Sequence, residues 1–396
     1  MKYWRGYLVA FIMAAIAWAL MQFAQAHPVL VDMIYPYVTR LIISSLADWS
    51  GALAFSLWQV LLIGLVALGL ASVVLMIVLK WNPVQWFGWV MAVVSCIFMM
   101  QTVLYGLNAY SSPLADDARM EIVDFTVSEL NETTVYFRDL ANKMAAEVTR
   151  DEKGDPVFAS FEELAQQAGE GFTVLTYDKA ISVFAGSTAP VKKLSWSGLY
   201  TMRRVAGVTS PLTGEASVNP DLPSVLLPFA MCREMAHRMS IYSRDDADYA
   251  AFLACVNNQS AEFQYSAYVM AYQICYDALS SIPTSTAQAC AAQTAKGVGD
   301  LLRQDLQDYH DFYGDTTGSA TVRTTAATLP TEADPDAPAE VIFSEYAGTA
   351  DLLASWYITE FILPLHEEEE IPFNPLDPTQ VDLTTSVIEE TVPKKD

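Results

Sequence analysis

Three long stretches of the chain are apolar and carry no charged side chain. They cover about residues 6–26, 52–79 and 84–107. A helix needs about 20 apolar residues to cross the hydrocarbon of a bilayer, and each stretch reaches that length. A soluble helix of this length would carry charges on its exposed face. We therefore predict three transmembrane helices within a membrane domain of residues 1–110.

The charges divide the chain into two unlike parts. Residues 1–110 contain four basic and two acidic residues, a net charge of +2. The whole chain carries −24, so the remainder carries −26. An acidic part of this kind stays soluble and excludes nucleic acid as a partner, because phosphates are bound by lysine and arginine. We place the acidic domain at residues 111–365 and a disordered acidic tail at 366–396.

Basic side chains flank the predicted spans on one side. Lys2 and Arg5 precede the first span, and Lys80 lies in the turn between the second and the third. Basic flanks favour the cytoplasm, so we predict a cytoplasmic N-terminus and an acidic domain outside the bacterial cell membrane. Residues 27–49 are interrupted by prolines and charges, which predicts a connector at the outer surface. Residues 24–26 also resemble a signal-peptide cleavage site, and cleavage there would leave the acidic domain on the same side.

The residue pattern of the outer domain predicts a mostly helical, α+β arrangement. Apolar residues recur at helical spacing over 114–147, 161–168, 223–239, 246–257, 262–280, 287–312 and 339–363. The β-branched and aromatic residues at 172–175 and 181–184 favour strands or extended segments. Residues 315–338 are rich in Thr, Ala and Pro and predict a flexible segment. The predicted fold class is therefore mainly α, with three transmembrane helices followed by this outer domain.

Four of the five cysteines fall in the outer domain, at Cys232, Cys255, Cys275 and Cys290. An exported domain permits disulfides, and four cysteines allow three pairings. Cys275 with Cys290 is the preferred pair, because Pro283 predicts a turn between two helices. Free buried thiols are an equally good reading of the same residues.

The run Cys-Arg-Glu-Met-Ala-His at 232–237 has the spacing of the zinc-peptidase motif His-Glu-x-x-His, with arginine in the first histidine position. Two histidines four residues apart share one helix face and reach one metal, and the glutamate beside them activates a bound water. Arg233 cannot act as a ligand, because its guanidinium stays protonated and has no lone pair. Cys232 points about 100° away from Arg233 on a helix, and His310 lies far along the chain, so neither is a good replacement.

The stretch 211–255, together with the spans, resembles a bacterial family of membrane-anchored, zincin-like metallopeptidases, the domain-of-unknown-function 3810 family. The resemblance rests on Thr-Gly-Glu-Ala-Ser-Val-Asn at 213–219, on the run at 232–237, and on Asp-Ala-Asp at 246–248. It implies a zincin-like outer domain. It also implies zinc ligands at the positions of Arg233, His237 and Asp246, and a general base at Glu234.

The departures from the family pattern predict a loss of catalysis. His237 is intact, Asp246 is one methylene shorter than the glutamate of the family, and Arg233 is not a ligand. A catalytic zinc needs about three protein ligands. We therefore expect a pseudoenzyme without a bound cofactor, which recognises a protein or peptide at the cell surface.

Two other functions remain open at this point. One is an active zinc peptidase with an irregular site, in which Glu234 is the base and His237 and Asp246 are ligands. The other is a structural membrane protein. For Arg233 we expect a bidentate ion pair that joins it to Asp246 and Glu234 in place of the metal. The alternative for Arg233 is a side chain that extends into solvent.

Overall fold

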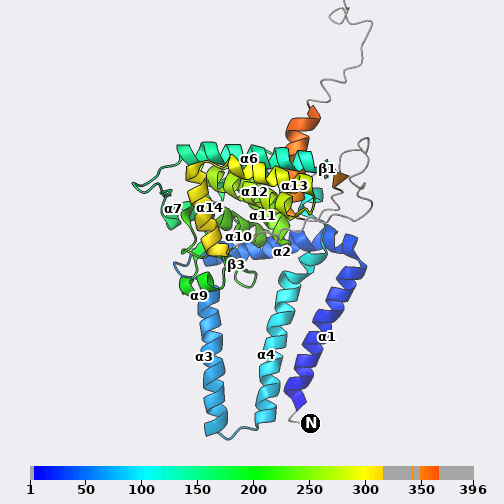
Figure 1. Cartoon of the computed structure of the whole chain (residues 1–396). Helices are drawn as coiled ribbons and strands as arrows, with labels where there is room; N and C mark the ends of the chain where they lie inside the picture. Colours follow the sequence, from blue (N-terminus) through cyan, green and yellow to red (C-terminus); the bar gives the residue numbers. More distant parts are fainter. Residues whose placement is uncertain (1–3, 119, 315–340, 343–347, 365–396) are drawn as a thin grey trace, which may run out of the picture.

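Three apolar helices run side by side and form the lower part of the molecule (Figure 1). The computed structural model describes residues 4–118, 120–314, 341–342 and 348–364. The three helices are α1 (Arg5–Ala26), α3 (Leu57–Val78) and α4 (Pro83–Leu104). Each has 22 residues, about 33 Å of helix, which is long enough for a hydrocarbon core of about 30 Å. They fall within the three predicted spans, except that α1 and α4 each begin one residue earlier.

A fourth helix, α2 (Pro28–Gly51), crosses the upper ends of these three and lies beneath the outer domain (Figure 1). By length and composition it too could cross a membrane. Polar contacts nevertheless join it to the outer domain. Arg40 Nε donates to the carbonyl of Met239 at 3.0 Å, and Thr39 Oγ1 lies 3.1 Å from Ser240 Oγ. The segment predicted as a connector is thus a continuous helix that is docked on the outer domain.

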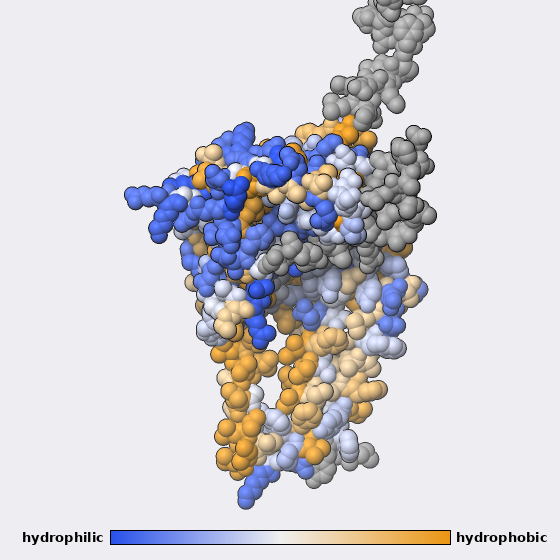
Figure 2. Space-filling model, in the orientation of Figure 1, coloured by the Kyte–Doolittle hydropathy of each residue, from blue (hydrophilic) through white to orange (hydrophobic). Residues whose placement is uncertain are grey.

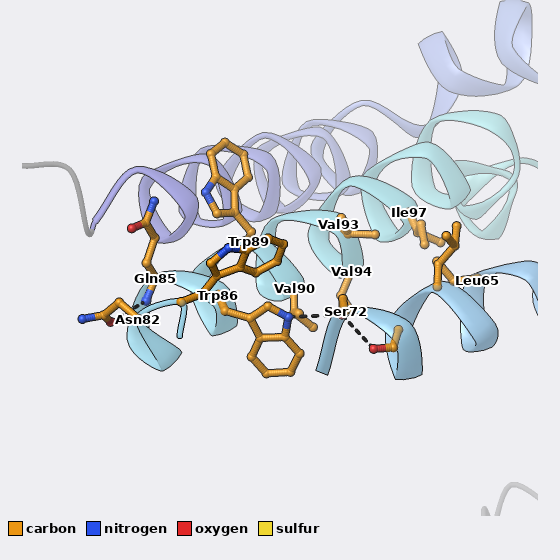
Figure 3. Close-up of a pocket in the computed structure, with 13 residues that line it drawn as sticks. Leu65, Ser72, Asn82, Gln85, Trp86, Trp89, Val90, Val93, Val94 and Ile97 are labelled. Atoms are coloured by element: carbon orange, nitrogen blue, oxygen red, sulfur yellow. Dashed lines mark hydrogen bonds between the residues drawn. The ribbon is translucent and has the colours of Figure 1, made fainter. Parts of the chain in front are cut away.

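α1 and α4 pack closely, whereas α3 stands apart (Figure 1). A Cβ on Gly6 would overlap the backbone of Gly88, so glycine allows the close approach of α1 and α4. Along α3 only Gln59 is buried. An apolar cavity of about 770 Å³ separates α3 from α4, and across it Trp86 Nε1 donates to Ser72 Oγ at 3.1 Å (Figure 3). Apolar side chains cover most of these helices and hydrophilic ones most of the outer domain (Figure 2), the distribution expected of helices that can cross a bilayer.

The outer domain is mainly helical, as predicted, and is built around α12. Its helices are α5 (Leu114–Asp117), α6 (Val127–Glu147), α7 (Phe161–Gln167), α8 (Glu170–Tyr177), α9 (Ser197–Met202), α10 (Leu227–Arg238), α11 (Arg244–Val256), α12 (Ala261–Ser281), α13 (Ser285–Lys296), α14 (Asp300–Tyr313) and α15 (Thr349–Tyr357). α12 packs against α6, α10, α11, α13 and α15, and its buried side chains belong to the main apolar core. α10 in turn contacts α2, so the core reaches down to the membrane-side helix.

Two small sheets complete the domain. The strands are β1 (Phe125–Thr126), β2 (Lys192–Lys193), β3 (Gly207–Ser210), β4 (Glu215–Val218) and β5 (Val341–Ile342). The first sheet has the order β2-β4-β3, with β3 antiparallel and β2 parallel to β4, and Gly207 opposite Val218. β1 pairs antiparallel with β5. α10 packs on β3 and β4, so the three-stranded sheet forms one wall beside the run at 232–237.

The two predicted strands are wrong, because both segments are helical. Residues 172–175 lie in α8, and residues 181–184 include the 3₁₀ turn Ser182–Phe184. In α8, Phe172 and Leu175 are buried three residues apart, which is a helical spacing that the β-branched residues beside them obscured.

Other predicted helices are present, but they begin or end at residues other than those predicted. The pattern at 114–147 divides into α5 and α6, because Thr126 and Glu129 form a capping box that starts α6. The pattern at 287–312 divides at Gly297 into α13 and α14. Residues 315–338 and the tail at 366–396 lie outside the described residues.

Of the two readings of the outer cysteines, the Cys275–Cys290 disulfide is wrong and the free thiols agree with the structure, in which all five cysteines are free. Cys275 is buried on α12 and Cys290 is half-buried on α13. Cys232 and Cys255 are fully buried on α10 and α11 and are close neighbours. Burial and the neighbouring Cys232 raise the pKa of Cys255 well above its ordinary value, so this thiol is inert packing.

Candidate functional site at Arg233

α10 carries the run at 232–237 in a nearly inaccessible position. Every residue of α10 except His237 is buried. Pro228 lies in its first turn, where a missing N–H costs little, and Ser240, with a φ of +72°, follows its end. Ser243 then caps α11 by accepting the N–H of Asp246 at 3.4 Å. Because α10 and α11 pack against each other, their polar side chains meet between the two helices.

Arg233 does not extend into solvent but joins two buried carboxylates. It is only 8% exposed, and its Nη1 lies 3.5 Å from Asp248 Oδ1. Its Nε lies 3.5 Å from Glu234 Oε1. We call Arg233, Glu234 and Asp248 the Arg233 cluster. The guanidinium presents a different nitrogen to each carboxylate and so bridges two residues. It does not form the predicted bidentate pair, in which two nitrogens would contact a single carboxylate.

The surroundings keep Arg233 charged. Burial alone would lower its pKa, but Asp248, Tyr313 and Glu234, together with a hydrogen bond to Tyr313, raise the pKa above its ordinary value. Asp248 also lies 3.5 Å from Arg244 Nε at the start of α11. The ion pairs of the cluster therefore link α10 to α11, and the hydrogen bond to Tyr313 links Arg233 to the end of α14.

The wall formed by β3 orients Glu234. Thr209 Oγ1 lies 2.9 Å from Glu234 Oε2 and 2.9 Å from its carbonyl oxygen. A Cβ on Gly207 would overlap the Glu234 side chain, so glycine at this position allows the carboxylate to lie against the strand. The carboxylate of the predicted general base is thus fixed between Thr209 and Arg233.

His237 is held by a different set of groups at the membrane side of α10. Its Nδ1 lies 2.9 Å from the carbonyl of Ile241 and 3.2 Å from the hydroxyl of Tyr105. A carbonyl only accepts, so Nδ1 carries the proton and the lone pair of the neutral ring is on Nε2. Tyr105 comes from the end of α4, so this contact also links the motif helix to a membrane helix.

The structure brings Asp248, and not Asp246, to Arg233. Two residues advance a helix by about 200°, so the two side chains point in nearly opposite directions and only one can face α10. The predicted pairing of Arg233 with Asp246 is therefore wrong. Asp246 instead faces a separate cavity beside α5, where its Oδ1 is buried without a hydrogen-bond partner. Burial raises the pKa of Asp246 to about 7, against the lowering effect of the Leu114 N–H.

Asp246→Asn is expected to make stability less dependent on pH. The pKa of about 7 in the folded chain exceeds an unfolded value of about 4, so this group adds stability at low pH that is lost as the pH rises through about 7. The free energy of unfolding of the variant, minus that of wild type, should therefore increase by about 2–3 kcal/mol from pH 5 to pH 8. Thermal unfolding at the two pH values measures this, with Asp116→Asn on the exposed part of α5 as the control. A difference in free energy of unfolding that stays constant with pH would contradict the prediction.

Comparison with known proteins identifies the family. The model of one family, described as "Protein of unknown function (DUF3810)", matches residues 32–325, well over half of the chain. The chain belongs to the DUF3810 family. No curated protein and no solved structure matches it. The match runs from α2 to beyond the end of α14, so it includes the Arg233 cluster and the contacts between the outer domain and the membrane helices.

The side chains at the centre of this DUF3810 domain do not fit zinc. Zinc needs several neutral or anionic donors around one point, whereas the Arg233 guanidinium contacts both carboxylates of the cluster. Within the described ranges, no group of three or more His, Cys, Asp or Glu side chains is arranged to hold a metal ion. Cys232 turns away to donate to the carbonyl of Ala168 at 3.6 Å, and His310 packs edge-on against Tyr309.

The segment at 213–219 of this DUF3810 chain has a structural role that its sequence does not indicate. The Thr-Gly-Glu-Ala-Ser-Val-Asn segment attaches the outer domain to the membrane helices. The buried Glu215 carboxylate accepts the N–H groups of Leu57 at 2.9 Å and Trp58 at 2.7 Å, which start α3, and lies 2.6 Å from Lys192 Nζ. Gly214 has a φ of +70°, and a Cβ there would overlap the backbone of α2. The segment is therefore a structural joint between the two parts of the protein.

Proposed function

We propose that this DUF3810 member is a membrane-anchored metallopeptidase-like protein that has lost peptidase chemistry. Its helices α1, α3 and α4 cross the bacterial cell membrane, and α2 lies along the outer surface. Arg5 and the α3–α4 turn with Lys80 lie at the same end of the molecule, away from the outer domain (Figure 1), which supports a cytoplasmic N-terminus.

One observation carries the proposal. A buried, permanently charged Arg233 contacts both Glu234 and Asp248, where the resemblance implies a zinc ion beside the general base. A guanidinium neutralises the two carboxylates and links α10 to α11, so it supplies the electrostatic part of what a metal would do. It cannot polarise a peptide carbonyl as a Lewis acid or lower the pKa of a bound water.

The outer domain then acts by recognition. A zincin-like domain without catalysis keeps a surface shaped for peptides, and the acidic exterior keeps that surface soluble next to the membrane. We infer that it binds a protein or peptide at the cell surface. An active peptidase with an irregular zinc site and a purely structural membrane protein are the competing functions.

A peptidase assay distinguishes the proposed function from the first competing function, an active peptidase. The full-length protein in nanodiscs, incubated with a peptide library and added zinc, should cleave no more than its Glu234→Gln variant does. Cleavage that disappears with a chelator and in the Glu234→Gln variant would establish an active enzyme instead.

Photocrosslinking in cells distinguishes a binding protein from the second competing function, a purely structural membrane protein. A photoreactive residue in place of Tyr242, which is 44% exposed and packs at a tilt against the Tyr105 ring, should give a discrete protein adduct. The same residue in place of Tyr177 on α8, which is 79% exposed, serves as the control and should not give that adduct. Identical patterns at the two positions would favour the structural role.

A further inference from the structure

A small cavity lies where the outer domain meets α2 and the end of α4. Its volume is about 180 Å³. It lies between α2, the 3₁₀ turn Gly106–Tyr110 that follows α4, helix α5, and the turn between α10 and α11. The polar side chains that matter here are Arg40, Asn108, Asp117 and Asp246. None of them belongs to the Arg233 cluster, so a ligand bound in this cavity would be independent of the proposed function.

Two buried acceptors in the wall of this cavity have no hydrogen-bond partner. Asp246 is 6% exposed and Asn108 is 3% exposed, and the Oδ1 atom of each is unpaired. The orientation of the Asn108 amide is fixed, because its Nδ2 donates to the carbonyl of Tyr105 at 3.1 Å. Leaving buried acceptors unpaired is costly. Above about pH 7, where Asp246 is ionised, both unpaired atoms accept, so the group that satisfies them must donate.

The charge of the wall favours a cation as that donor. Asp117, which is exposed, adds a second carboxylate to that of Asp246. Among the described residues, no Lys or Arg nitrogen comes within 4.0 Å of either carboxylate. Arg40 also lines the cavity, but its Nε and Nη1 donate to the carbonyls of Met239 and Ser182. The hydrogen bonds of Arg40 are thus made to backbone groups, but its charge offsets part of the rise that burial causes in the pKa of Asp117. Two carboxylates and one guanidinium leave one net negative charge in the wall when Asp246 is ionised.

We propose that this cavity binds a primary ammonium group. Such a group is small enough for the cavity, carries the charge that the two aspartates require, and has three N–H donors for Asp246 Oδ1, Asn108 Oδ1 and Asp117. A trimethylated ammonium has the same charge but no N–H, so it leaves both buried acceptors unpaired.

The position of the cavity allows two sources for this group. α2 and the turn after α4 lie at the upper ends of the membrane helices (Figure 1), which is the level of lipid headgroups. The ammonium is therefore either part of an ethanolamine headgroup or part of a small free amine. The recognition chemistry is the same in the two cases.

Thermal unfolding of the full-length protein tests the proposal. In detergent, saturating ethanolamine should raise Tm by about 5 °C, whereas choline at the same concentration should not. In nanodiscs, phosphatidylethanolamine should raise Tm relative to phosphatidylcholine if the headgroup is the source. A shift in the nanodiscs alone assigns the site to the lipid, and a shift with free ethanolamine assigns it to small amines.

Matched variants decide whether the cavity is responsible. Asp246→Asn should raise the ethanolamine concentration needed for the Tm shift at least about tenfold, because it removes the buried charge. Asp117→Asn, at an exposed residue that leaves folding intact, should raise that concentration as well. Asp116→Asn, on the same helix but outside the cavity wall, should respond as wild type does. The proposal is overturned if neither ethanolamine nor its phospholipid stabilises the wild type, or if Asp246→Asn and Asp117→Asn respond as strongly as Asp116→Asn.

Discussion

Arg233→Met will lower the stability of the outer domain by about 3–5 kcal/mol, or roughly 10 °C in Tm. The variant leaves Glu234 and Asp248 buried without the cation that contacts them both, and an uncompensated buried charge costs that much. Thermal unfolding of the full-length protein measures the effect.

Two comparisons make this result specific to the Arg233 cluster. Arg303→Met removes a guanidinium that is mostly exposed and pairs with the exposed Asp300, so it should cost at most about 1 kcal/mol. Adding Glu234→Gln and Asp248→Asn to Arg233→Met should recover most of the loss, because the unpaired charges are then gone. Equal losses for Arg233→Met and Arg303→Met would contradict the bridging role of Arg233.

Glu215→Ala will have an effect of similar size at the joint between the outer domain and α3. It removes the acceptor for two N–H groups at the start of α3 and leaves Lys192, only 12% exposed, without its carboxylate. Breaking such a buried pair costs about 3–5 kcal/mol. Hydrogen exchange should also become faster at the backbone of Leu57 and Trp58, because their N–H groups lose their partner.

The adjacent ion pair provides the control for Glu215. Lys193 Nζ lies 2.7 Å from Glu162, but the two side chains are 47% and 66% exposed. Glu162→Ala should therefore leave Tm and the exchange at the start of α3 nearly unchanged. If Glu162→Ala and Glu215→Ala have the same effect, the joint does not depend on the buried carboxylate.

The strongest patterns in the sequence predicted the strongest features of the fold. Uninterrupted apolar runs predicted the positions of α1, α3 and α4, because a helix of that length and composition has few other stable environments. The helices α10, α11 and α12 also follow from apolar spacing. α8 was misread because Thr173 and Val174 favour a strand locally, whereas packing of Phe172 and Leu175 decides the outcome.

The candidate site was predictable only in part. The spacing of Arg233, Glu234 and His237 identified the motif helix, but the partner of Arg233 depends on which face of α11 is turned toward α10. That rotation is decided by packing across the domain, so Asp246 and Asp248 could not be distinguished from the chain alone. The role of Glu215 was likewise hidden, because it depends on the start of α3, more than 150 residues earlier.

The zinc content of the purified full-length protein tests most directly whether a guanidinium has taken the place of a metal. Elemental analysis after purification without chelators, with added zinc removed by gel filtration, should give far less than one zinc per chain, and a chelator should leave Tm unchanged. About one tightly held zinc per chain, lost together with stability in a His237→Ala variant, would contradict the replacement of the metal by Arg233.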